Sequence, residues 1–144
     1  MFPERVGRLL IDGVTNLNNW YNEFLEEESL SDTDRVYAGF VHECFKAKKD
    51  CPLNSINGIS FKTAAELQGY LDKFLEKLEE EPIPVYLDNS NYGALLRRSL
   101  VASGIHPATY SPKRWPSLAQ NIADLLQGNA TAAYNAYPAS WVRT

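Results

Sequence analysis

The sequence predicts a mainly α-helical protein with a single strand near its N-terminus. Four stretches, residues 16–27, 35–49, 63–81 and 115–126, carry apolar residues three and four positions apart. That spacing places the apolar side chains on one face of a helix. A different pattern occupies Val6–Ile11, which is short, largely apolar and followed by an Asp-Gly turn, as is typical of a strand buried inside a sheet.

The first two helices have recognisable boundaries. The first is expected from Asn16 to about Glu27, because its apolar residues form one stripe: Leu17, Trp20, Tyr21, Phe24 and Leu25. The second should begin after the N-cap candidates of residues 31–34 and end near Lys49. Residues 51–58 are rich in Pro, Asn, Ser and Gly and predict a loop.

The third helix is the clearest. Thr63 and Glu66 have the spacing of a capping box, and the apolar stripe that follows continues through Glu81. Pro82 ends this helix, and residues 82–86 should run extended into a polar turn at residues 88–91.

Two further helices are expected in the C-terminal third. One runs from Tyr92 to about Ala102, with Gly104 in the usual position of a C-terminal cap. A loop bounded by Pro107 and Pro112 should separate it from the next, which starts near Trp115 and closes at Gly128. Residues 130–136 are rich in alanine and predict one or two more helical turns.

Composition excludes several classes of protein. The net charge of −4 and a pI near 5.2 argue against a nucleic-acid surface, which normally carries a basic stripe. We expect no membrane span, because no apolar run approaches the ~18 residues that one requires. Pro3, Glu4, Arg5 and Arg8 interrupt any signal-peptide core, so the localisation of this chain stays open.

The residues that could carry catalysis are poorly arranged in the sequence. Ser60 lies in Gly58-Ile-Ser-Phe-Lys62, which lacks the second glycine of a nucleophile elbow. His42 and Cys44 are two residues apart on a predicted helix, so their side chains do not face each other. His106 has no acidic residue nearby in the sequence. We therefore expect no catalytic, cofactor-binding or metal-binding residues in this chain.

Two features are typical of secreted proteins. Cys44 and Cys51 match no common zinc pattern and favour a disulfide, with two reduced buried thiols as the alternative. Asn129 begins the sequence Asn-Ala-Thr, an acceptor for N-linked glycosylation.

The first fourteen residues, Met1-Phe-Pro-Glu-Arg-Val-Gly-Arg-Leu-Leu-Ile-Asp-Gly-Val14, resemble a stretch of α/β-hydrolases of the tripeptidyl-aminopeptidase type. Other parts of the chain resemble the lid of the same family: Leu30–Cys44 with Cys51–Leu53, Thr63–Val85, Tyr110–Gln120 and Gly128–Thr131. Together these stretches cover most of residues 1–137.

The resemblance implies a fold and a division of the chain. Residues 1–14 would be a remnant of the hydrolase core, a strand and a turn, and residues 15–144 a helical lid or cap. It also implies that Cys44 and Cys51 form the cysteine pair of the lid. Asp12 matches the Asp-Gly that follows the family's strand and not its catalytic acid.

The family consists of serine hydrolases, often secreted, that act on peptides or on small esters and amides. The resemblance places the catalytic serine before Met1 and the acid and histidine after the lid, so this chain is expected to be a fragment that is inactive alone. The alternative is a non-catalytic helical interaction module derived from such a lid. A small enzyme of unrelated mechanism is a third reading. Self-association through the N-terminal strand is a further expectation, since unpaired strand edges invite pairing.

Overall fold

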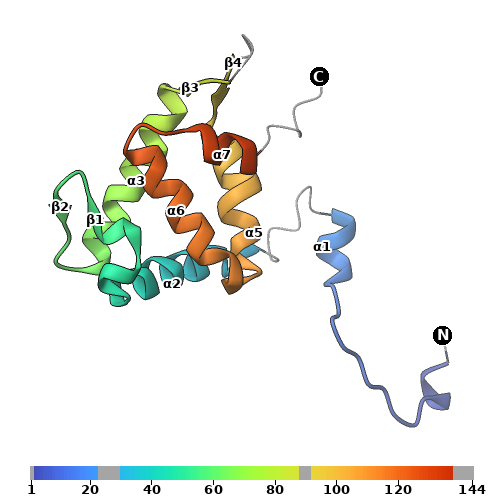
Figure 1. Cartoon of the computed structure of the whole chain (residues 1–144). Coiled ribbons are helices and arrows are strands. Elements are labelled where there is room, and N and C mark those ends of the chain that lie inside the picture. The colour runs from blue at the N-terminus through green and yellow to red at the C-terminus, as the bar shows by residue number, and fades with distance from the viewer. Residues whose placement is uncertain (1, 23–29, 88–91, 138–144) are drawn as a thin grey trace. The chain divides into compact units, whose positions relative to one another are not determined.

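The computed structural model describes residues 2–22, 30–87 and 92–137 and divides into two compact units. The N-terminal unit is Met1–Asp32 and the helical unit is Thr33–Thr144 (Figure 1). The boundary falls after the first helix, α1, so that helix belongs to the same unit as the N-terminal residues. The described residues are mainly α-helical, with short antiparallel strands, so the predicted fold class, mainly α, is confirmed.

The strand expected at Val6–Ile11 is not formed, and this prediction is wrong. The N-terminal unit contains a 3-10 turn, η1 (Pro3–Arg5), and α1 (Leu17–Asn22), with no regular structure between them. The physical reason is the lack of a partner. A strand satisfies its N–H and C=O groups through a neighbouring strand. The sheets of the described residues pair only β1 (Ser55–Ile56) with β2 (Ile59–Ser60) and β3 (Ile83–Tyr86) with β4 (Tyr92–Leu95).

The described part of helix α1 covers Leu17–Asn22, and the continuation to Glu27 that the apolar stripe predicts lies outside the described residues. Asn16 accepts a hydrogen bond through its side-chain oxygen from the Asn18 N–H at 3.1 Å, which satisfies one donor at the start of the helix.

Within residues 33–87 and 92–137, the helical unit has four separate α-helices and one continuous helical run. The separate helices are α2 (Thr33–Lys46), α3 (Ala64–Glu80), α6 (Trp115–Leu126) and α7 (Thr131–Ala136). The continuous run joins α4 (Arg97–Ser99), the π-helical segment η5 (Leu100–Ile105) and α5 (His106–Thr109). Helix α2 packs against both α3 and α5 across one end of the unit, and α7 packs against the β3–β4 hairpin at the other end (Figure 1).

The capping box predicted for α3 is confirmed, with one difference. The Thr63 hydroxyl accepts a hydrogen bond from the Glu66 N–H at 3.1 Å. The Glu66 carboxylate reaches back one residue further than in the usual box and accepts from the Lys62 N–H at 2.8 Å. Together these bonds satisfy two backbone donors at and just before the helix start, which fixes where α3 begins.

The end of α6 is also as predicted. Gly128 has a φ of +87°, the left-handed conformation that glycine adopts without steric cost. The Gly128 N–H bonds to the Leu125 carbonyl at 3.0 Å and the Asn129 N–H bonds to the Asp124 carbonyl at 2.8 Å. These two bonds form a Schellman motif and satisfy carbonyls of the last turn.

Two short hairpins connect the helices. Residues 51–58, expected to be a loop, contain the 3-10 turn η4 (Pro52–Asn54) and β1 (Ser55–Ile56), which pairs with β2 (Ile59–Ser60). The turn residues Asn57 and Gly58 have φ values of 52° and 77°, as a two-residue hairpin turn requires. The extended segment predicted after Pro82 is β3 (Ile83–Tyr86), which pairs with β4 (Tyr92–Leu95). The polar turn expected at residues 88–91 lies outside the described residues.

The helix predicted from Tyr92 to Ala102 is wrong in its bounds. Residues 92–95 pair with β3, and the helical run starts at Arg97 and continues past Gly104 and Pro107. A proline inside a helix has no N–H to donate, and the widened turn of η5 ends two residues before Pro107. Gly104 is not a cap, because it lies inside η5. It packs against the Tyr137 ring, where an added Cβ would come within 3.1 Å of Cζ.

The core of the helical unit draws on α2, α3, η5, α5, α6 and α7, on the turn η4 and on the strands β1, β3 and β4. The side chains of Leu53, Ile56, Leu67, Leu95 and Leu100 are fully buried. In contrast, large apolar residues of the N-terminal unit are exposed, and Leu10 is 97% exposed. No helix among the described residues is both long enough and apolar enough to cross a lipid bilayer.

A pair of leucine truncations tests this division of the core. Leu71→Ala, at a position 2% exposed in α3, should lower the free energy of unfolding by about 2–5 kcal/mol, because it leaves a cavity in the core. Leu10→Ala should change it by less than about 0.5 kcal/mol. Urea unfolding followed by circular dichroism measures both. An equal cost at the two positions would contradict the structure.

Candidate functional site

The structure keeps the residues with nucleophilic or acid-base chemistry apart. Ser60 is exposed on β2. The His42 Nδ1 atom lies 3.3 Å from the Glu43 carboxylate, and both side chains are more than half exposed. His106 packs edge-on against the Tyr110 ring, with 5.3 Å between the ring centroids. Within the described part of the chain, neither imidazole hydrogen-bonds to a serine hydroxyl, so these groups form no Ser-His-acid arrangement.

Glu43 belongs to an exposed ionic cluster on α2. The Lys46 ammonium, 3.2 Å from the carboxylate, and then the His42 imidazole hold the pKa of Glu43 below its ordinary value. Such a carboxylate stays ionised at neutral pH and is a poor general acid. A search of the described residues for groups of three or more His, Cys, Asp or Glu side chains able to hold a metal ion found none.

The sequence-predicted cysteine pair is a disulfide. The Cys44 and Cys51 sulfurs are bonded, and the Cα atoms are 5.3 Å apart. The bond joins the last turn of α2 to the start of η4. Next to it, the Asn54 amide donates to the carbonyls of Cys44 at 2.7 Å and of Lys48 at 2.8 Å. The disulfide and Asn54 therefore hold the same connection at two points, and Asn54 also supplies partners for carbonyls at the end of α2.

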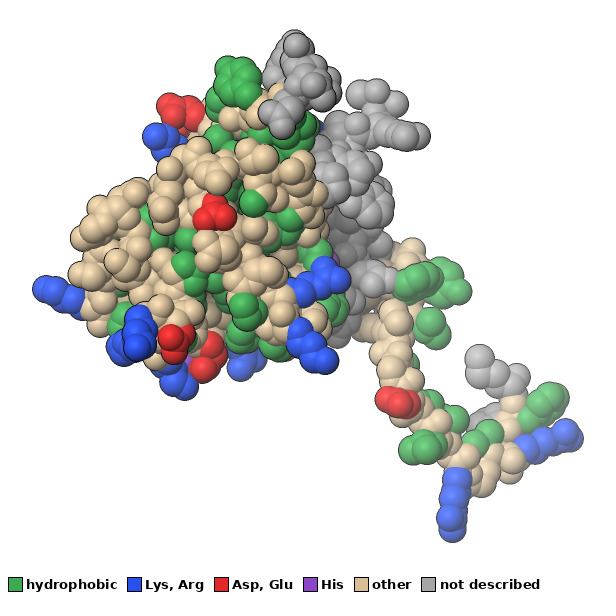
Figure 2. All heavy atoms as spheres, viewed as in Figure 1, with side chains coloured by type: hydrophobic (Ala, Val, Ile, Leu, Met, Phe, Trp, Pro, Cys, Tyr) green, Lys and Arg blue, Asp and Glu red, His purple; other side chains and the backbone are tan. Residues whose placement is uncertain are grey.

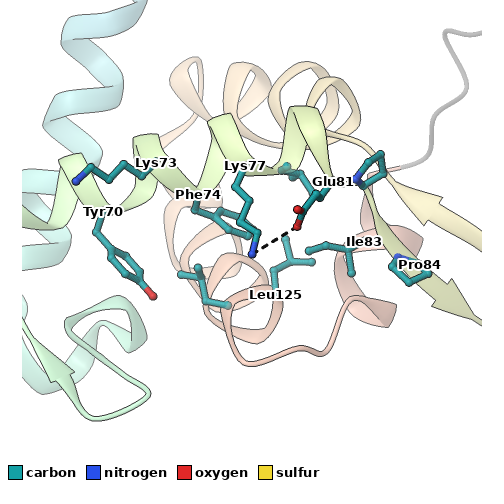
Figure 3. A pocket seen from close by; sticks show the side chains of 11 residues that line it. Tyr70, Lys73, Phe74, Lys77, Glu81, Ile83, Pro84 and Leu125 are labelled. Atoms are coloured by element: carbon teal, nitrogen blue, oxygen red, sulfur yellow. Dashed lines mark ion pairs between the residues drawn. The ribbon is translucent and has the colours of Figure 1, made fainter.

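An apolar cleft lies between α3, β3 and the end of α6 (Figure 3). Its volume is about 550 Å³, within the range of small-molecule sites. We call it the α3–α6 cleft. Its lining comes from three elements: Tyr70, Lys73, Phe74, Lys77, Leu78 and Glu81 from α3 and its end, Pro82, Ile83 and Pro84 from β3 and the residue before it, and Leu125 and Leu126 from α6.

Polar groups occupy the rim of this cleft. The Phe74 ring and the Lys77 side chain extend from α3 towards Leu125 and Ile83 (Figure 3). The Lys77 ammonium pairs with the Glu81 carboxylate at 3.5 Å, and both side chains are about 70% exposed. An ion pair this exposed contributes little to stability. It leaves both charges available to a bound molecule, and the cleft offers an apolar floor with an ammonium and a carboxylate at its edge.

Sequence analysis missed the α3–α6 cleft. Lys73 and Lys77 had the spacing of an outer, solvated helix face. The cleft forms where Pro82, Ile83 and Pro84 follow the end of α3 and where Leu125 and Leu126 of α6 line the same cavity. The only sequence signal was the Pro-Ile-Pro stretch that ends α3, which indicates that the helix stops but not which distant residues lie beside its end.

A second, smaller cleft lies beside the disulfide. Its volume is about 340 Å³, and it is lined by residues of α2, α6 and the connection between α2 and η4, including Phe40, Cys44, Cys51 and Trp115. The Trp115 indole N–H donates to the Ala108 carbonyl at 3.0 Å, and the ring meets Phe40 edge-on. The indole nitrogen of Trp115 is therefore already hydrogen-bonded within the fold, and the ring of Trp115 serves to pack the core beside this cleft.

The N-terminal unit presents a continuous series of exposed apolar side chains. Figure 2 shows hydrophobic side chains standing out along this unit. The large ones are Phe2, Val6, Leu9, Leu10, Ile11, Val14, Leu17, Trp20 and Tyr21, which are 57–97% exposed. Single exposed apolar residues are common on proteins, whereas large exposed apolar surfaces are rare on soluble monomers.

Helices α2 and α3 share a half-buried polar contact between Tyr37 and Asp72. Burial, followed by the charge and the hydrogen bond of Asp72, raises the pKa of Tyr37. Burial raises the pKa of Asp72, the hydrogen bond from Tyr37 opposes that effect, and the charges of Glu76 and Asp34 add to it. The contact therefore favours a neutral phenol that donates to the carboxyl group.

Comparisons of the chain with protein-family models, with curated proteins and with solved structures found no match.

Loss of the disulfide should be measurable as a loss of stability. In the chain-entropy model, a crosslink between residues 7 apart stabilises by about 2.5 kcal/mol. The double variant Cys44→Ala, Cys51→Ala should lose this amount in urea unfolding. Reducing agent should destabilise the natural chain to a similar extent and leave the double variant unchanged. A natural chain that is insensitive to reductant would contradict the structural role of the bond.

The Tyr37–Asp72 contact predicts an alkaline pH dependence. The pKa of Tyr37 is raised in the folded state, so its stabilisation is fully present below the unfolded value of about 10 and is lost as the pH rises above it. The difference in unfolding free energy between the natural chain and Tyr37→Phe should therefore stay constant up to about pH 9 and shrink as the pH rises through about 10 to about 11. Tyr21→Phe, at an exposed position, is the control. An unchanged difference would show that the contact is not formed.

Proposed function

We propose that this chain is the substrate-gating lid of an α/β-hydrolase of the tripeptidyl-aminopeptidase type and is not a catalyst by itself. The substrate of the complete enzyme would be a peptide or a small ester or amide. The observation that carries the proposal is the contrast between the two units: a well-packed helical unit follows a stretch of apolar residues that has no core of its own.

The composition of the N-terminal unit supports the proposal that residues 1–14 pack against a sheet formed by another part of a complete hydrolase. Val6, Leu9, Leu10 and Ile11 are exposed, although full burial of such a side chain is worth about 1.5–3 kcal/mol. A segment of this composition gains most when neighbouring strands supply both hydrogen bonds and apolar contacts. The core sheet of an α/β-hydrolase would supply both at residues 1–14.

The helical unit has the properties that a lid needs. It holds its shape through its own core and disulfide, so it can move as one body. It also carries the α3–α6 cleft, an apolar surface with charged groups at its rim that can meet the apolar part of a substrate. Lids of this kind exclude water from the reaction and control entry of the substrate.

The same proposal accounts for the missing catalytic residues. A serine hydrolase needs a nucleophile, a histidine base, an acid that orients it, and N–H donors for the oxyanion. Ser60, His42 and His106 stand on separate elements, β2, α2 and α5, and the His42 side chain is bonded to the adjacent Glu43. In the proposal these groups would come from chain segments outside residues 1–144.

The purified chain should therefore show no hydrolysis of aminopeptidase or ester substrates above background. Chromogenic amides and esters provide the assay, and Ser60→Ala is the matched variant. Both proteins should give the same background rate, since removal of a full triad leaves only weak catalysis. Turnover that disappears in Ser60→Ala would overturn the proposal and identify this chain as an enzyme of its own.

The coding sequence around this chain tests the lid proposal directly. The proposal requires an in-frame serine flanked by glycines before Met1 and an acid and a histidine after Thr144. Joining those segments to the chain should produce a hydrolase, and deletion of Thr33–Tyr137 from it should change substrate range or KM. Their absence from the reading frame would leave the interaction module as the better explanation.

The second candidate function, a helical interaction module, is favoured by the exposed apolar side chains of residues 2–21. In that case the partner would be another protein or a second copy of this chain. Deletion of residues 1–14 should then remove concentration-dependent self-association and leave the helical unit folded. Light scattering after gel filtration measures the first effect and circular dichroism the second. Loss of helical structure on deletion would show that the segment belongs to the core of this chain.

A further inference from the structure

We propose that Asn129 carries an N-linked glycan, transferred in the compartment where the Cys44–Cys51 disulfide forms. The inference does not depend on the hydrolase proposal, although both use the Cys44–Cys51 disulfide, and it is tested separately. It begins with the sequence: Asn129-Ala130-Thr131 is the only Asn-x-Ser/Thr acceptor, with x other than proline, in the 144 residues.

The backbone presents this acceptor on an ordered turn at the surface. The Schellman motif at the end of α6 fixes the Asn129 N–H on the Asp124 carbonyl at 2.8 Å. Ala130, which is 6% exposed, and Ala133, which is fully buried, anchor the following residues in the core. Asn129 and Thr131, on either side of Ala130, are both exposed. The acceptor amide and the hydroxyl two residues later therefore face solvent while the residue between them holds the turn in place.

The Asn129 side chain is also oriented for modification. Its Oδ1 atom accepts a hydrogen bond from the Thr131 N–H at 3.2 Å, which directs the oxygen towards the start of α7. In the described part of the chain, its Nδ2 atom donates to no protein group. A glycan on Nδ2 would replace no internal hydrogen bond of the fold, and the exposed position requires no change in the core.

The chemistry is a transfer from a lipid-linked oligosaccharide pyrophosphate. The Asn129 Nδ2 atom bonds to C1 of the first sugar, the bond from C1 to the pyrophosphate oxygen breaks, and the lipid pyrophosphate leaves with the electron pair. The amide proton passes to a base of the transferase. Such transfer takes place in the same oxidising compartment in which structural disulfides form. The Cys44–Cys51 disulfide is therefore consistent with glycosylation at Asn129.

The experiment is translation of the full chain, behind a cleavable leader, in the presence of microsomal membranes, with expression in secreting eukaryotic cells as a second source. The natural chain should gain one glycan that peptide-N-glycosidase removes. Asn129→Gln and Thr131→Ala should lose the glycan, whereas Thr131→Ser, which keeps a hydroxyl, should retain it. Because transfer to the translocated chain does not require a stable fold, a variant that folds poorly still gives a readable result.

The state of the disulfide separates the outcomes. A chain that has entered the membranes and formed the Cys44–Cys51 bond, but is unmodified at position 129, would overturn the proposal. A glycan that persists in Asn129→Gln would do the same. Neither result would bear on the lid proposal, since hydrolase activity and the coding sequence are not part of this measurement.

Discussion

The connection between α2 and the first hairpin is the constraint on which the helical unit depends. In this short stretch Leu53 and Ile56 are fully buried, and η4 contacts both α2 and α6. The Cys44–Cys51 bond ties its beginning to α2, Asn54 bonds two carbonyls at the end of α2, and Asn57 donates to the Leu126 carbonyl of α6 at 3.0 Å. Each attachment fixes a different point of the same stretch. Together they fix the distance between α2 and α6, which are far apart in the sequence. This arrangement also determines the shape of the α3–α6 cleft, because one wall of the cleft is the end of α6, where Asn57 donates to the Leu126 carbonyl.

The two units have opposite relations to solvent, and the function we propose rests on that contrast. The helical unit buries its leucines and needs no partner for its core. The N-terminal unit exposes apolar side chains from Phe2 to Tyr21 and has no sheet to place them in. A lid attached to a hydrolase core would use both properties, one for an independent moving body and the other for attachment. An exposed apolar segment is at the same time a site of self-association when its partner is missing.

Local signals predicted what local interactions determine. Thr63 and Glu66 marked the start of α3, Gly128 marked the end of α6, and both depend on hydrogen bonds within a few residues. Signals failed where distant residues decide the outcome. Tyr92-Gly-Ala-Leu95 became a strand because Ile83–Tyr86 lies opposite it, and Val6–Ile11 did not because no strand among the described residues pairs with it. The disulfide could be predicted from the sequence, because its two cysteines are close in the chain. The α3–α6 cleft was not, because the contact of Leu125 and Ile83 with one face of α3 is set by tertiary structure.

Hydrogen–deuterium exchange of the intact oxidised chain, followed amide by amide, tests the central claim most directly. The claim is that the helical unit is stable by itself and that the apolar N-terminal segment has no partner. Amides in α3 and α6 should then exchange only through global unfolding, whereas those of Leu9, Leu10 and Ile11 should exchange at the rate of an unstructured peptide. Protection at Leu9–Ile11 equal to that in α3 would contradict the account, because it would place this segment in a core formed by the chain itself.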